Sequence, residues 1–321
     1  MFSFLVTGSE GNIGPYLIAK IHQNFPDAKV IRVARNNIYG ENKPGDIINR
    51  GDLNDKNFVD QIFRDNKIDY VIYASAYPYG KYGFNHPDEV LNNEKNCLKN
   101  VLSNCENVKK IVYLSSVLVY ESSNLSPFTE KITEQIPPPR SPYGLAKYFG
   151  EQAVKEESSR HMVPYTIWRA HNIISPLEET KKEDGHVYTE FYKKIYLAKA
   201  KEIKIFGSGR QMRCFTWVED LAQGIIDFLN DTRTDNQIFN IGGEESKTLI
   251  ELKDELIKIG KEKKYLDADY QPIIQTGEEF YGIDDPKRLS SIKKIKDILG
   301  WRPSTSFSAC FEKFVDYKQK L

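Results

Sequence analysis

Tyr143 and Lys147 are the residues whose types and spacing best fit acid–base chemistry. They lie four positions apart in the stretch SPYGLAKYFGE (residues 141–151), which opens a predicted helix, so both side chains lie on one helical face. A phenol with a pKa of about 10 is a poor base near neutral pH, but an adjacent ammonium favours its ionised form. The chain contains 19 tyrosines, so an ordinary surface pair also explains this spacing unless other groups accompany it.

Ser116 supplies a third polar group. It ends the apolar run in IVYLSSVLVY (residues 111–120), which predicts a buried strand, at a place where a purely structural strand more often carries Val or Ile. Side chains at the carboxyl end of a parallel strand face the ligand crevice. We therefore expect Ser116 to hydrogen-bond a substrate hydroxyl while Tyr143 removes its proton.

A glycine-rich turn near the start of the sequence predicts a dinucleotide site. In VTGSEGNIG (residues 6–14) the glycines follow a predicted strand and open a predicted helix. In this setting the backbone can approach a pyrophosphate, whose charge then lies at the helix N-terminus. The residues expected to contact the cofactor here are Gly8, Gly11, Asn12, Ile13 and Gly14.

The end of the second predicted strand bears on the choice between NAD and NADP. An acidic residue at this point would bind both ribose hydroxyls of NAD, but the sequence reads VARNN, with Ala34 and Arg35. Arg35 can pair with a 2′-phosphate and favours NADP, whereas Glu10, inside the glycine turn, favours NAD. The alternative for Arg35 is an ordinary solvated loop residue.

Strands and helices alternate along the first half of the chain. Short apolar runs predict buried strands at residues 2–7, 29–34, 70–74, 110–115 and 165–168, and amphipathic stretches predict helices at 12–24, 54–64, 87–105 and 143–159. This alternation predicts an α/β fold with a doubly wound parallel sheet of the Rossmann type. We expect a dinucleotide-binding domain over residues 1–170, with returning segments near 207–241, and a smaller interleaved C-terminal substrate lobe over 171–206 and 242–321.

Composition argues against several other classes of protein. Lys plus Arg and Asp plus Glu each number 45 in 321 residues, so no global basic field exists to attract nucleic acid or an anionic membrane. No apolar run approaches the length of a membrane span, and MFSFLV lacks the basic segment of a signal peptide, so we expect a cytoplasmic protein. The four cysteines show no metal-ligand spacing, and we expect free thiols and no metal site.

Together these motifs resemble the extended short-chain dehydrogenase/reductase family, in particular its NAD(P)-dependent nucleotide-sugar epimerases, dehydratases and reductases. The similarity runs over nearly the whole chain and includes SSVLVY, the Tyr-x-x-x-Lys of residues 143–147, WRAHNIISP and IFGSGRQMRCFTWVEDLAQGI. It implies a nucleoside-diphosphate sugar as partner, a homodimer, and cofactor contacts by Tyr143 and Lys147. Further cofactor contacts that it implies are Asp52, Leu53, Ala74, Ala76 and Asn92, and further substrate contacts are Asn172, His186 and Arg213.

The resemblance implies hydride transfer at C4 of a nucleoside-diphosphate hexose, by a 4-epimerase or a 4-keto-sugar reductase. Dehydratases of the family carry an Asp-Glu pair directly after the catalytic Ser or Thr, where this chain has Val117 and Leu118. The Gly-His-Val of residues 185–187 is similar to GDP-fucose synthases and, with Arg35, favours the reductase, although the partner Cys of those enzymes is Leu118 here. A short-chain reductase of a non-sugar carbonyl and a non-catalytic dinucleotide sensor are the alternatives.

Overall fold

A parallel sheet forms the centre of the larger part of the molecule. The structure, a computed structural model, describes residues 1–35, 43–77, 81–180, 185–277 and 287–321. Within these residues a seven-stranded sheet has the order β11-β6-β5-β4-β1-β2-β3, and every neighbouring pair is parallel. Its strands are β1 (Ser3–Thr7), β2 (Lys29–Ala34), β3 (Ile47–Arg50), β4 (Tyr70–Tyr73), β5 (Lys110–Ser116), β6 (Tyr165–Ala170) and β11 (Gln237–Ile241).

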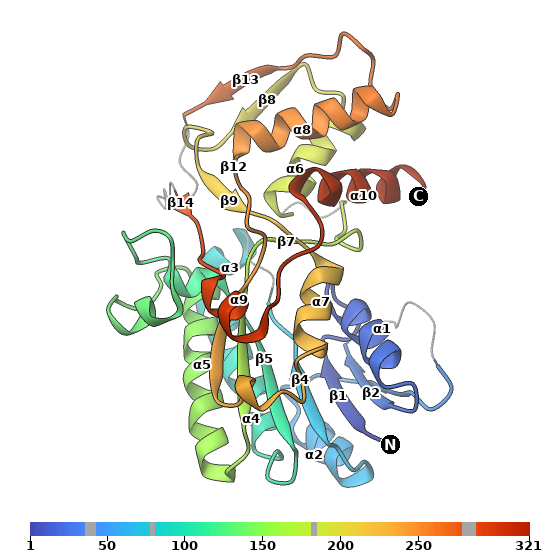
Figure 1. Ribbon diagram of the computed structural model, residues 1–321, viewed down its shortest axis with the longest axis vertical. Helices are drawn as coiled ribbons and strands as arrows, with labels where there is room; N and C mark the ends of the chain where they lie inside the picture. The colour runs from blue at the N-terminus through green and yellow to red at the C-terminus, as the bar shows by residue number, and fades with distance from the viewer. Residues whose placement is uncertain (36–42, 78–80, 181–184, 278–286) are drawn as a thin grey trace.

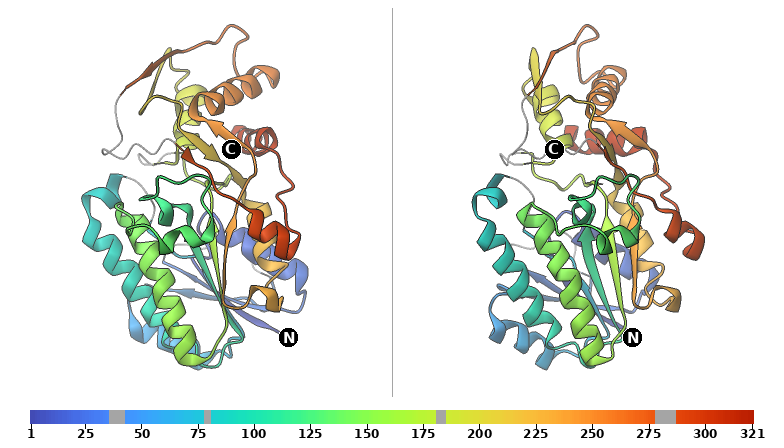
Figure 2. Two further views of the ribbon diagram at one scale, coloured as in Figure 1. Left: turned by 60° about the vertical axis from the view of Figure 1, so that its left-hand side comes forward. Right: turned by 90° about the vertical axis from the view of Figure 1, so that its left-hand side faces the viewer.

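Helices cover both faces of this sheet (Figure 1). One face packs against α1 (Gly14–Asn24), α7 (Val218–Ile226) and α9 (Lys293–Leu299). The other packs against α2 (Lys56–Asp65), α4 (Pro87–Leu102) and α5 (Pro142–His161), and Figure 2 shows α4 and α5 side by side on that face. The predicted doubly wound α/β fold is confirmed.

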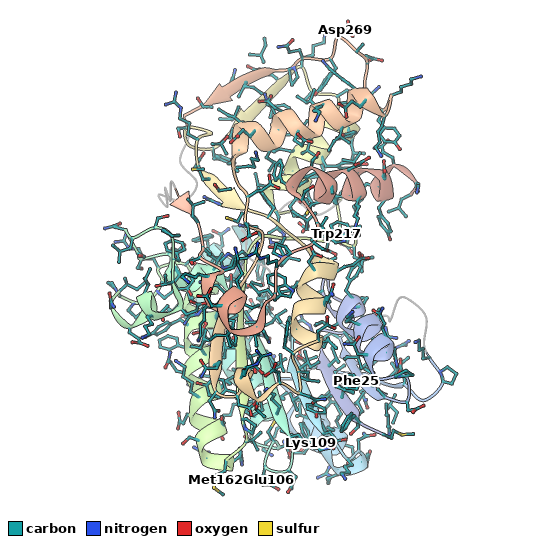
Figure 3. All side chains as sticks on the ribbon, viewed as in Figure 1. Phe25, Glu106, Lys109, Met162, Trp217 and Asp269 are labelled. Atoms are coloured by element: carbon teal, nitrogen blue, oxygen red, sulfur yellow. The ribbon has the colours of Figure 1, made fainter. Side chains whose placement is uncertain are left out.

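A smaller lobe lies at the carboxyl edge of the sheet (Figure 1). It has an aromatic-rich core of its own, to which Tyr188, Tyr192, Phe311 and Phe314 contribute. Figure 3 shows Trp217 where the lobe meets the sheet domain and Asp269 at the lobe's far end. Its elements are β7 (Ile173–Ile174), α6 (Val187–Tyr192), β8 (Glu202–Ile205), β9 (Met212–Cys214), β10 (Thr216–Trp217), β12 (Ser246–Thr248), α8 (Leu249–Glu262), β13 (Ile273–Thr276), β14 (Lys287–Arg288) and α10 (Phe307–Gln319).

The remaining elements are short. They are α3 (Lys81–Asn85), the 3₁₀ turns η1 (Val117–Tyr120), η2 (Glu130–Glu134) and η4 (Thr232–Thr234), and the π-helical turn η3 (Lys193–Leu197). The segment 207–241 starts with β9 in the smaller lobe and then returns through α7 and β11 to the large sheet. The exact division into two domains stays a prediction.

Three further expectations concern strands, thiols and membranes. The sequence did not predict β3 or β11, and the half-buried pattern of IINR in β3 explains the first omission. The four cysteines are buried and free, as expected. No helix within the described residues is long and apolar enough to cross a membrane.

The long helix α5 carries Tyr143 and Lys147, and specific residues fix its start. Ser141 caps the helix by accepting a hydrogen bond from the Gly144 N–H at 3.2 Å, and Pro142 occupies the first turn, where it needs no N–H partner. One turn beyond Lys147, the Glu151 carboxylate pairs with Arg169 of β6 and accepts from the Ser115 hydroxyl of β5. These contacts bind the helix to β5 and β6, which are neighbours in the sheet.

We predict that Glu151→Ala destabilises the fold by about 3 to 5 kcal/mol, because it leaves the Arg169 guanidinium buried without its carboxylate. Glu156→Ala on the same helix is the matched control, since Glu156 is exposed and its ion pair with Arg160 is worth less than about 1 kcal/mol. Urea unfolding of the unmodified protein and of the two variants measures the difference in the free energy of unfolding. Equal midpoints for the two variants would contradict this role of the ion pair.

Candidate active site

Ser116, Tyr143 and Lys147 come together at the carboxyl end of β5. Ser116 is the last residue of that strand, and its hydroxyl accepts a hydrogen bond from the Leu118 N–H at 3.2 Å, which turns the chain into η1. The Tyr143 phenol, in the first turn of α5, hydrogen-bonds with Ser116. The Lys147 ammonium lies 6.0 Å from the centre of the Tyr143 ring. This is the arrangement that the sequence motifs predicted.

Opposing influences act on the Tyr143 phenol. Burial raises its pKa most, and the negative charge of Glu94 raises it further. The ammonium of Lys147 and the hydrogen bond with Ser116 lower it, but the net pKa stays above the ordinary value. At neutral pH the phenol is therefore protonated, and ionisation needs an additional positive charge near the ring.

Lys147 is buried, and its ammonium has defined partners. It donates to Glu94 Oε1 at 3.0 Å and to the Ser75 carbonyl at 3.4 Å, and it lies 4.9 Å from the centre of the Tyr113 ring. Glu94 comes from α4 and also accepts a hydrogen bond from the Tyr113 hydroxyl at 2.7 Å. The lysine is thus held by a buried carboxylate that the sequence motifs did not reveal.

The glycine turn has the shape that a dinucleotide pyrophosphate requires. Gly8 has φ of +64°, and a Cβ on it would lie 2.9 Å from the Ala74 carbonyl oxygen. A Cβ on Gly14 would lie 2.3 Å from the Gly8 carbonyl oxygen, and the Gly11 N–H donates to that oxygen at 3.0 Å. Asn12 and Ile13 follow, and Ile13 precedes the first turn of α1. Side chains at Gly8 and Gly14 would therefore clash with the backbone, so this tight turn requires glycine at both positions.

Ala74 and Ser75, which follow β4, contact the glycine turn and Lys147, respectively. The Ala74 backbone abuts Gly8, and the next carbonyl, that of Ser75, accepts from Lys147. The Thr7 hydroxyl accepts hydrogen bonds from both the Ala74 and Ser75 N–H groups, at 3.1 and 3.2 Å. Ala76 follows and is exposed. A cofactor seated on the glycine turn would thus extend toward Lys147.

Glu10 and Arg35 occupy different surroundings at the end of the turn. The Glu10 carboxylate is nearly buried and accepts a hydrogen bond from the buried Arg32 guanidinium of β2. Arg35 is exposed, with its guanidinium 5.7 Å from the centre of the Tyr77 ring. Glu10 is therefore fixed within the turn, whereas Arg35 lies on its solvent side.

The other predicted cofactor contacts differ in exposure. Asp52 is exposed and its carboxylate accepts from the Asn54 N–H at 2.9 Å, while Leu53 is buried in the core beside α2 and α4. Asn92 lies exposed on α4, whereas Asn93 accepts from the Asn54 side chain at 2.8 Å. Asp52, Leu53 and Asn92 stay predictions as cofactor contacts.

Asn172 and Arg213 lie between the sheet and the smaller lobe. Asn172 follows β6 with φ of +34°, and its amide donates to the Cys214 carbonyl at 2.8 Å. Arg213, in β9, is half-buried and donates to the Met212 carbonyl at 2.8 Å. The backbone of Arg288 in β14 pairs with Arg213. Their predicted roles as substrate contacts stay predictions.

His186 forms an ion pair with a buried carboxylate. Its Nδ1 lies 2.7 Å from Glu178 Oε2, which also accepts from the Tyr188 hydroxyl at 2.5 Å. Burial raises the pKa of Glu178, but the charge and hydrogen bond of His186 outweigh burial and hold that pKa at about 2. Burial lowers the pKa of His186, and the Glu178 carboxylate reverses this to a net increase. The Glu178 carboxylate therefore favours the charged form of the imidazole.

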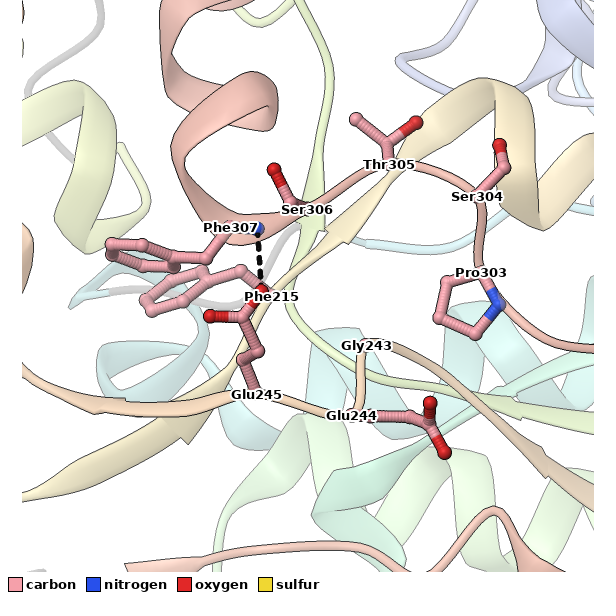
Figure 4. A pocket seen from close by; sticks show the side chains of 9 residues that line it. All are labelled: Phe215, Gly243, Glu244, Glu245, Pro303, Ser304, Thr305, Ser306 and Phe307. Atoms are coloured by element: carbon pink, nitrogen blue, oxygen red, sulfur yellow. Dashed lines mark hydrogen bonds between the residues drawn. The ribbon is translucent and has the colours of Figure 1, made fainter.

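A surface pocket lies apart from Ser116 and Tyr143. It has a volume of about 240 Å³ and lies between the loop after β11 and the start of α10 (Figure 4). Across it the Glu245 carboxylate accepts from the Phe307 N–H at 3.2 Å. Its lining residues are Phe215, Gly243, Glu244, Glu245, Pro303, Ser304, Thr305, Ser306 and Phe307.

Comparison with known proteins assigns the family. The sequence profile described as "NAD dependent epimerase/dehydratase family" matches residues 4–242, about three quarters of the chain. The chain belongs to this family. It is 29% identical to a "Putative UDP-glucose 4-epimerase" of Methanocaldococcus jannaschii over 98% of this chain and 97% of that protein, and 25% identical to the "dTDP-D-glucose 4,6-dehydratase" of Mus musculus over 98% and 88%.

A solved structure of the family has the same architecture. The UDP-glucose 4-epimerase of Thermotoga maritima, crystallised with UDP-glucose, matches with a TM-score of 0.86 at 25% identity over 99% of each chain. The family description names NAD, and the preference for NADP that Arg35 suggested finds no support in it. These relatives likewise give no support to the similarity with GDP-fucose synthases that the stretch around His186 suggested.

We predict that His186→Asn loses more stability in mild acid than in alkali. Asn can keep the hydrogen bond to Glu178 but loses the charge. Because the folded pKa of His186 is raised, the stability contributed by its charge is fully present below the unfolded pKa of about 6.5 and disappears as the pH rises through the folded pKa. Urea unfolding at about pH 5.5 and pH 9 tests this. A stability difference between the two proteins that is independent of pH would contradict the ion pair.

Proposed function

We propose that the protein is an NAD-dependent 4-epimerase of a UDP-hexose. The proposal rests on one observation: the adjacent residues Ala74 and Ser75 contact the glycine turn at Gly8 and the ammonium of Lys147. The glycine turn therefore lies close to Ser116, Tyr143 and Lys147. The T. maritima relative, a UDP-glucose 4-epimerase, and the M. jannaschii relative, described as a "Putative UDP-glucose 4-epimerase", support the substrate class and the reaction. Family membership supports the broader class of nucleotide-sugar enzyme.

The residues present fit the proposed cofactor. The turn at Gly8, Gly11 and Gly14 would hold the pyrophosphate at the start of α1, and Lys147 has a proton to offer a ribose hydroxyl beyond those it donates to Glu94 and Ser75. When bound, NAD⁺ supplies an acceptor for the hydride of a sugar C4 and returns that hydride later.

The protein's own residues would manage the proton. Ser116 would accept from or donate to the C4 oxygen and so hold it beside the Tyr143 phenol. Once a positive charge near the ring has ionised it, the Tyr143 phenolate would take the proton of the C4 hydroxyl as the C4–H electron pair leaves as hydride, so that a carbonyl replaces the C–H and O–H bonds. Tyr143 would return this proton to the C4 oxygen, and inversion would require the hydride to reach the opposite face of C4.

The residues after Ser116 favour epimerisation over dehydration. Dehydration in this family is expected to need an acidic pair where this chain has Val117 and Leu118, and both of these side chains are apolar and buried. Neither can transfer a proton at C5 or C6 of the sugar. The reductase alternative rested on Arg35 and His186, and Arg35 is exposed while His186 is paired with Glu178. Epimerisation requires neither residue.

We predict that the purified protein interconverts UDP-glucose and UDP-galactose, or another pair of UDP-hexose 4-epimers, without added cofactor. Tyr143→Phe should lower the rate by about two orders of magnitude or more, because it removes the proton-transfer group but keeps the ring. Tyr148→Phe on the same helix is the control and should retain activity, since the Tyr148 hydroxyl is not one of the proposed catalytic groups of Ser116, Tyr143 and Lys147. Chromatography of the sugar nucleotides measures both.

Two results would contradict this function. Consumption of one reduced cofactor per 4-keto sugar, without inversion of any saturated sugar nucleotide, would establish the reductase. Activity of Tyr143→Phe equal to that of the unmodified protein would remove Tyr143 from the chemistry.

Glu10 supports NAD as the bound cofactor. Its carboxylate is positioned in the glycine turn by Arg32, on the strand that in NAD enzymes ends with an acidic residue. A carboxylate here can accept hydrogen bonds from ribose hydroxyls and repels a 2′-phosphate. We propose that Glu10 replaces the acidic residue missing at Ala34.

We predict that NAD⁺ binds at least about tenfold more tightly than NADP⁺ and that Glu10→Gln removes most of this difference, because a hydrogen bond to a charged group is worth about 1.5 to 3 kcal/mol. Calorimetric titration of the cofactor-free protein measures both affinities. Arg35→Ala is the control and should leave the preference unchanged. Tighter binding of NADP⁺ that Arg35→Ala abolishes would instead assign the site to Arg35.

A further inference from the structure

A buried carboxylate lies beside the acid–base pair. Glu94, in the middle of α4, is only 4% exposed, and its Oε1 accepts hydrogen bonds from both the Lys147 ammonium and the Tyr113 hydroxyl. Neighbouring positions on this side of α4 are apolar and buried, among them Val90, Leu98 and Val101. A carboxylate on such a face is costly unless a cation and hydrogen bonds balance it. The Lys147 ammonium supplies that balance.

The surrounding fold makes room for this contact. Gly150, on α5, lies where a Cβ would come within 2.1 Å of the Tyr113 hydroxyl oxygen, so the absence of a side chain there lets Tyr113 reach Glu94. Tyr113 in turn stacks on Tyr73 of β4, with ring centres 5.8 Å apart. The pair of Glu94 and Lys147 is thus enclosed by packed aromatic rings and has little solvent to screen it.

We propose that Glu94 is a positioning residue for Lys147 and Tyr143, which holds the ammonium in place and offsets its charge at the phenol. This inference builds on the acid–base role given to Tyr143 under the proposed function. It follows from distance and burial: the ammonium that would favour the phenolate touches a carboxylate that opposes it. The pKa of Tyr143 responds to both charges, with Lys147 lowering it and Glu94 raising it.

Several other ionisable groups surround this site. Among the described residues, Glu94 is the carboxylate that forms an ion pair with Lys147. The other groups come from α4, β4, β5 and α5, and they are Cys97, Tyr73, Tyr113 and Glu151. Glu151 is paired with Arg169, and the pKa values of Tyr73 and Tyr113 are raised well above the ordinary value, mainly by burial, so both stay neutral. Glu94 is therefore the carboxylate that sets the charge balance at Lys147.

The test is a direct titration of Tyr143. Glu94→Gln keeps the shape and the acceptor oxygen but removes the charge, so the titration midpoint of Tyr143 should fall by about one pH unit, the lower end of the effect of a nearby charge. Isotope-labelled tyrosine observed by NMR in the cofactor-free protein, with Tyr143→Phe to assign the signal, measures the midpoint. Glu89→Gln, an exposed carboxylate on the same helix, is the matched control and should leave it unchanged.

A second variant separates charge from hydrogen bonding. Tyr113→Phe removes the hydrogen bond to Glu94 but keeps the carboxylate, and it should shift the midpoint by less than Glu94→Gln does. A midpoint in Glu94→Gln that equals those of the unmodified protein and of Glu89→Gln would overturn the proposal. So would a shift in Tyr113→Phe as large as that in Glu94→Gln, because packing would then explain both.

The titration also distinguishes this inference from the proposed function. If the protein is an epimerase, the pH at which its rate reaches half the maximum should move down with the midpoint in Glu94→Gln. If the midpoint moves but no variant inverts a UDP-hexose, the positioning role of Glu94 holds and the proposed reaction fails. If the rate profile is unchanged although the protein is active and the midpoint moves, Glu94 does not act through Tyr143 in the reaction, and the proposal is overturned.

Discussion

The ion pair between Glu151 and Arg169 is the constraint on which the candidate active site depends. It ties α5 to the neighbouring strands β5 and β6, because Glu151 also accepts a hydrogen bond from Ser115 of β5. Arg169 extends the network through the Tyr120 hydroxyl at 2.7 Å. Ser116 follows Ser115 in β5, and Lys147 lies one helical turn before Glu151 in α5, so these buried contacts hold the strand and the helix that carry Ser116 and Lys147. Catalytic geometry of this kind needs rigid support more than it needs additional contacts.

A second constraint operates along the edge of the sheet. Parallel strands bring their carboxyl ends to one edge, so β1, β4 and β5 end beside one another. The glycine turn follows β1, the Ala74 and Ser75 segment follows β4, and Ser116 ends β5. The candidate site therefore needs residues from all three strand ends. The close approach of Gly8 to Ala74 explains why the first of these turns needs glycine.

Residue patterns within one element were readable from the sequence, and contacts between distant elements were not. Apolar runs located most strands of the sheet, and Tyr143 and Lys147 were identified because a helix brings residues four apart together. The pair of Glu94 and Lys147 spans 53 positions, and only a carboxylate on the apolar side of α4 hinted at it. Arg35 was given a cofactor role from its position after β2, whereas the fold buries Glu10 and Arg32 beside the turn and leaves Arg35 exposed.

The charges of Lys147 and Glu94 oppose each other at Tyr143, and a bound oxidised cofactor would add a further positive charge. Without a cofactor, the Lys147 ammonium is matched by Glu94, and burial keeps the phenol protonated. An oxidised nicotinamide ring would add a positive charge beside Tyr143. The two buried carboxylates nearby are already paired, Glu94 with Lys147 and Glu151 with Arg169. That added charge would favour the phenolate when a hydride acceptor is present and not otherwise. On the proposed roles of Glu94 and Tyr143, a site in which Lys147 lacked Glu94 would ionise Tyr143 more readily in the empty protein, and the buried carboxylate would make proton removal conditional on the cofactor.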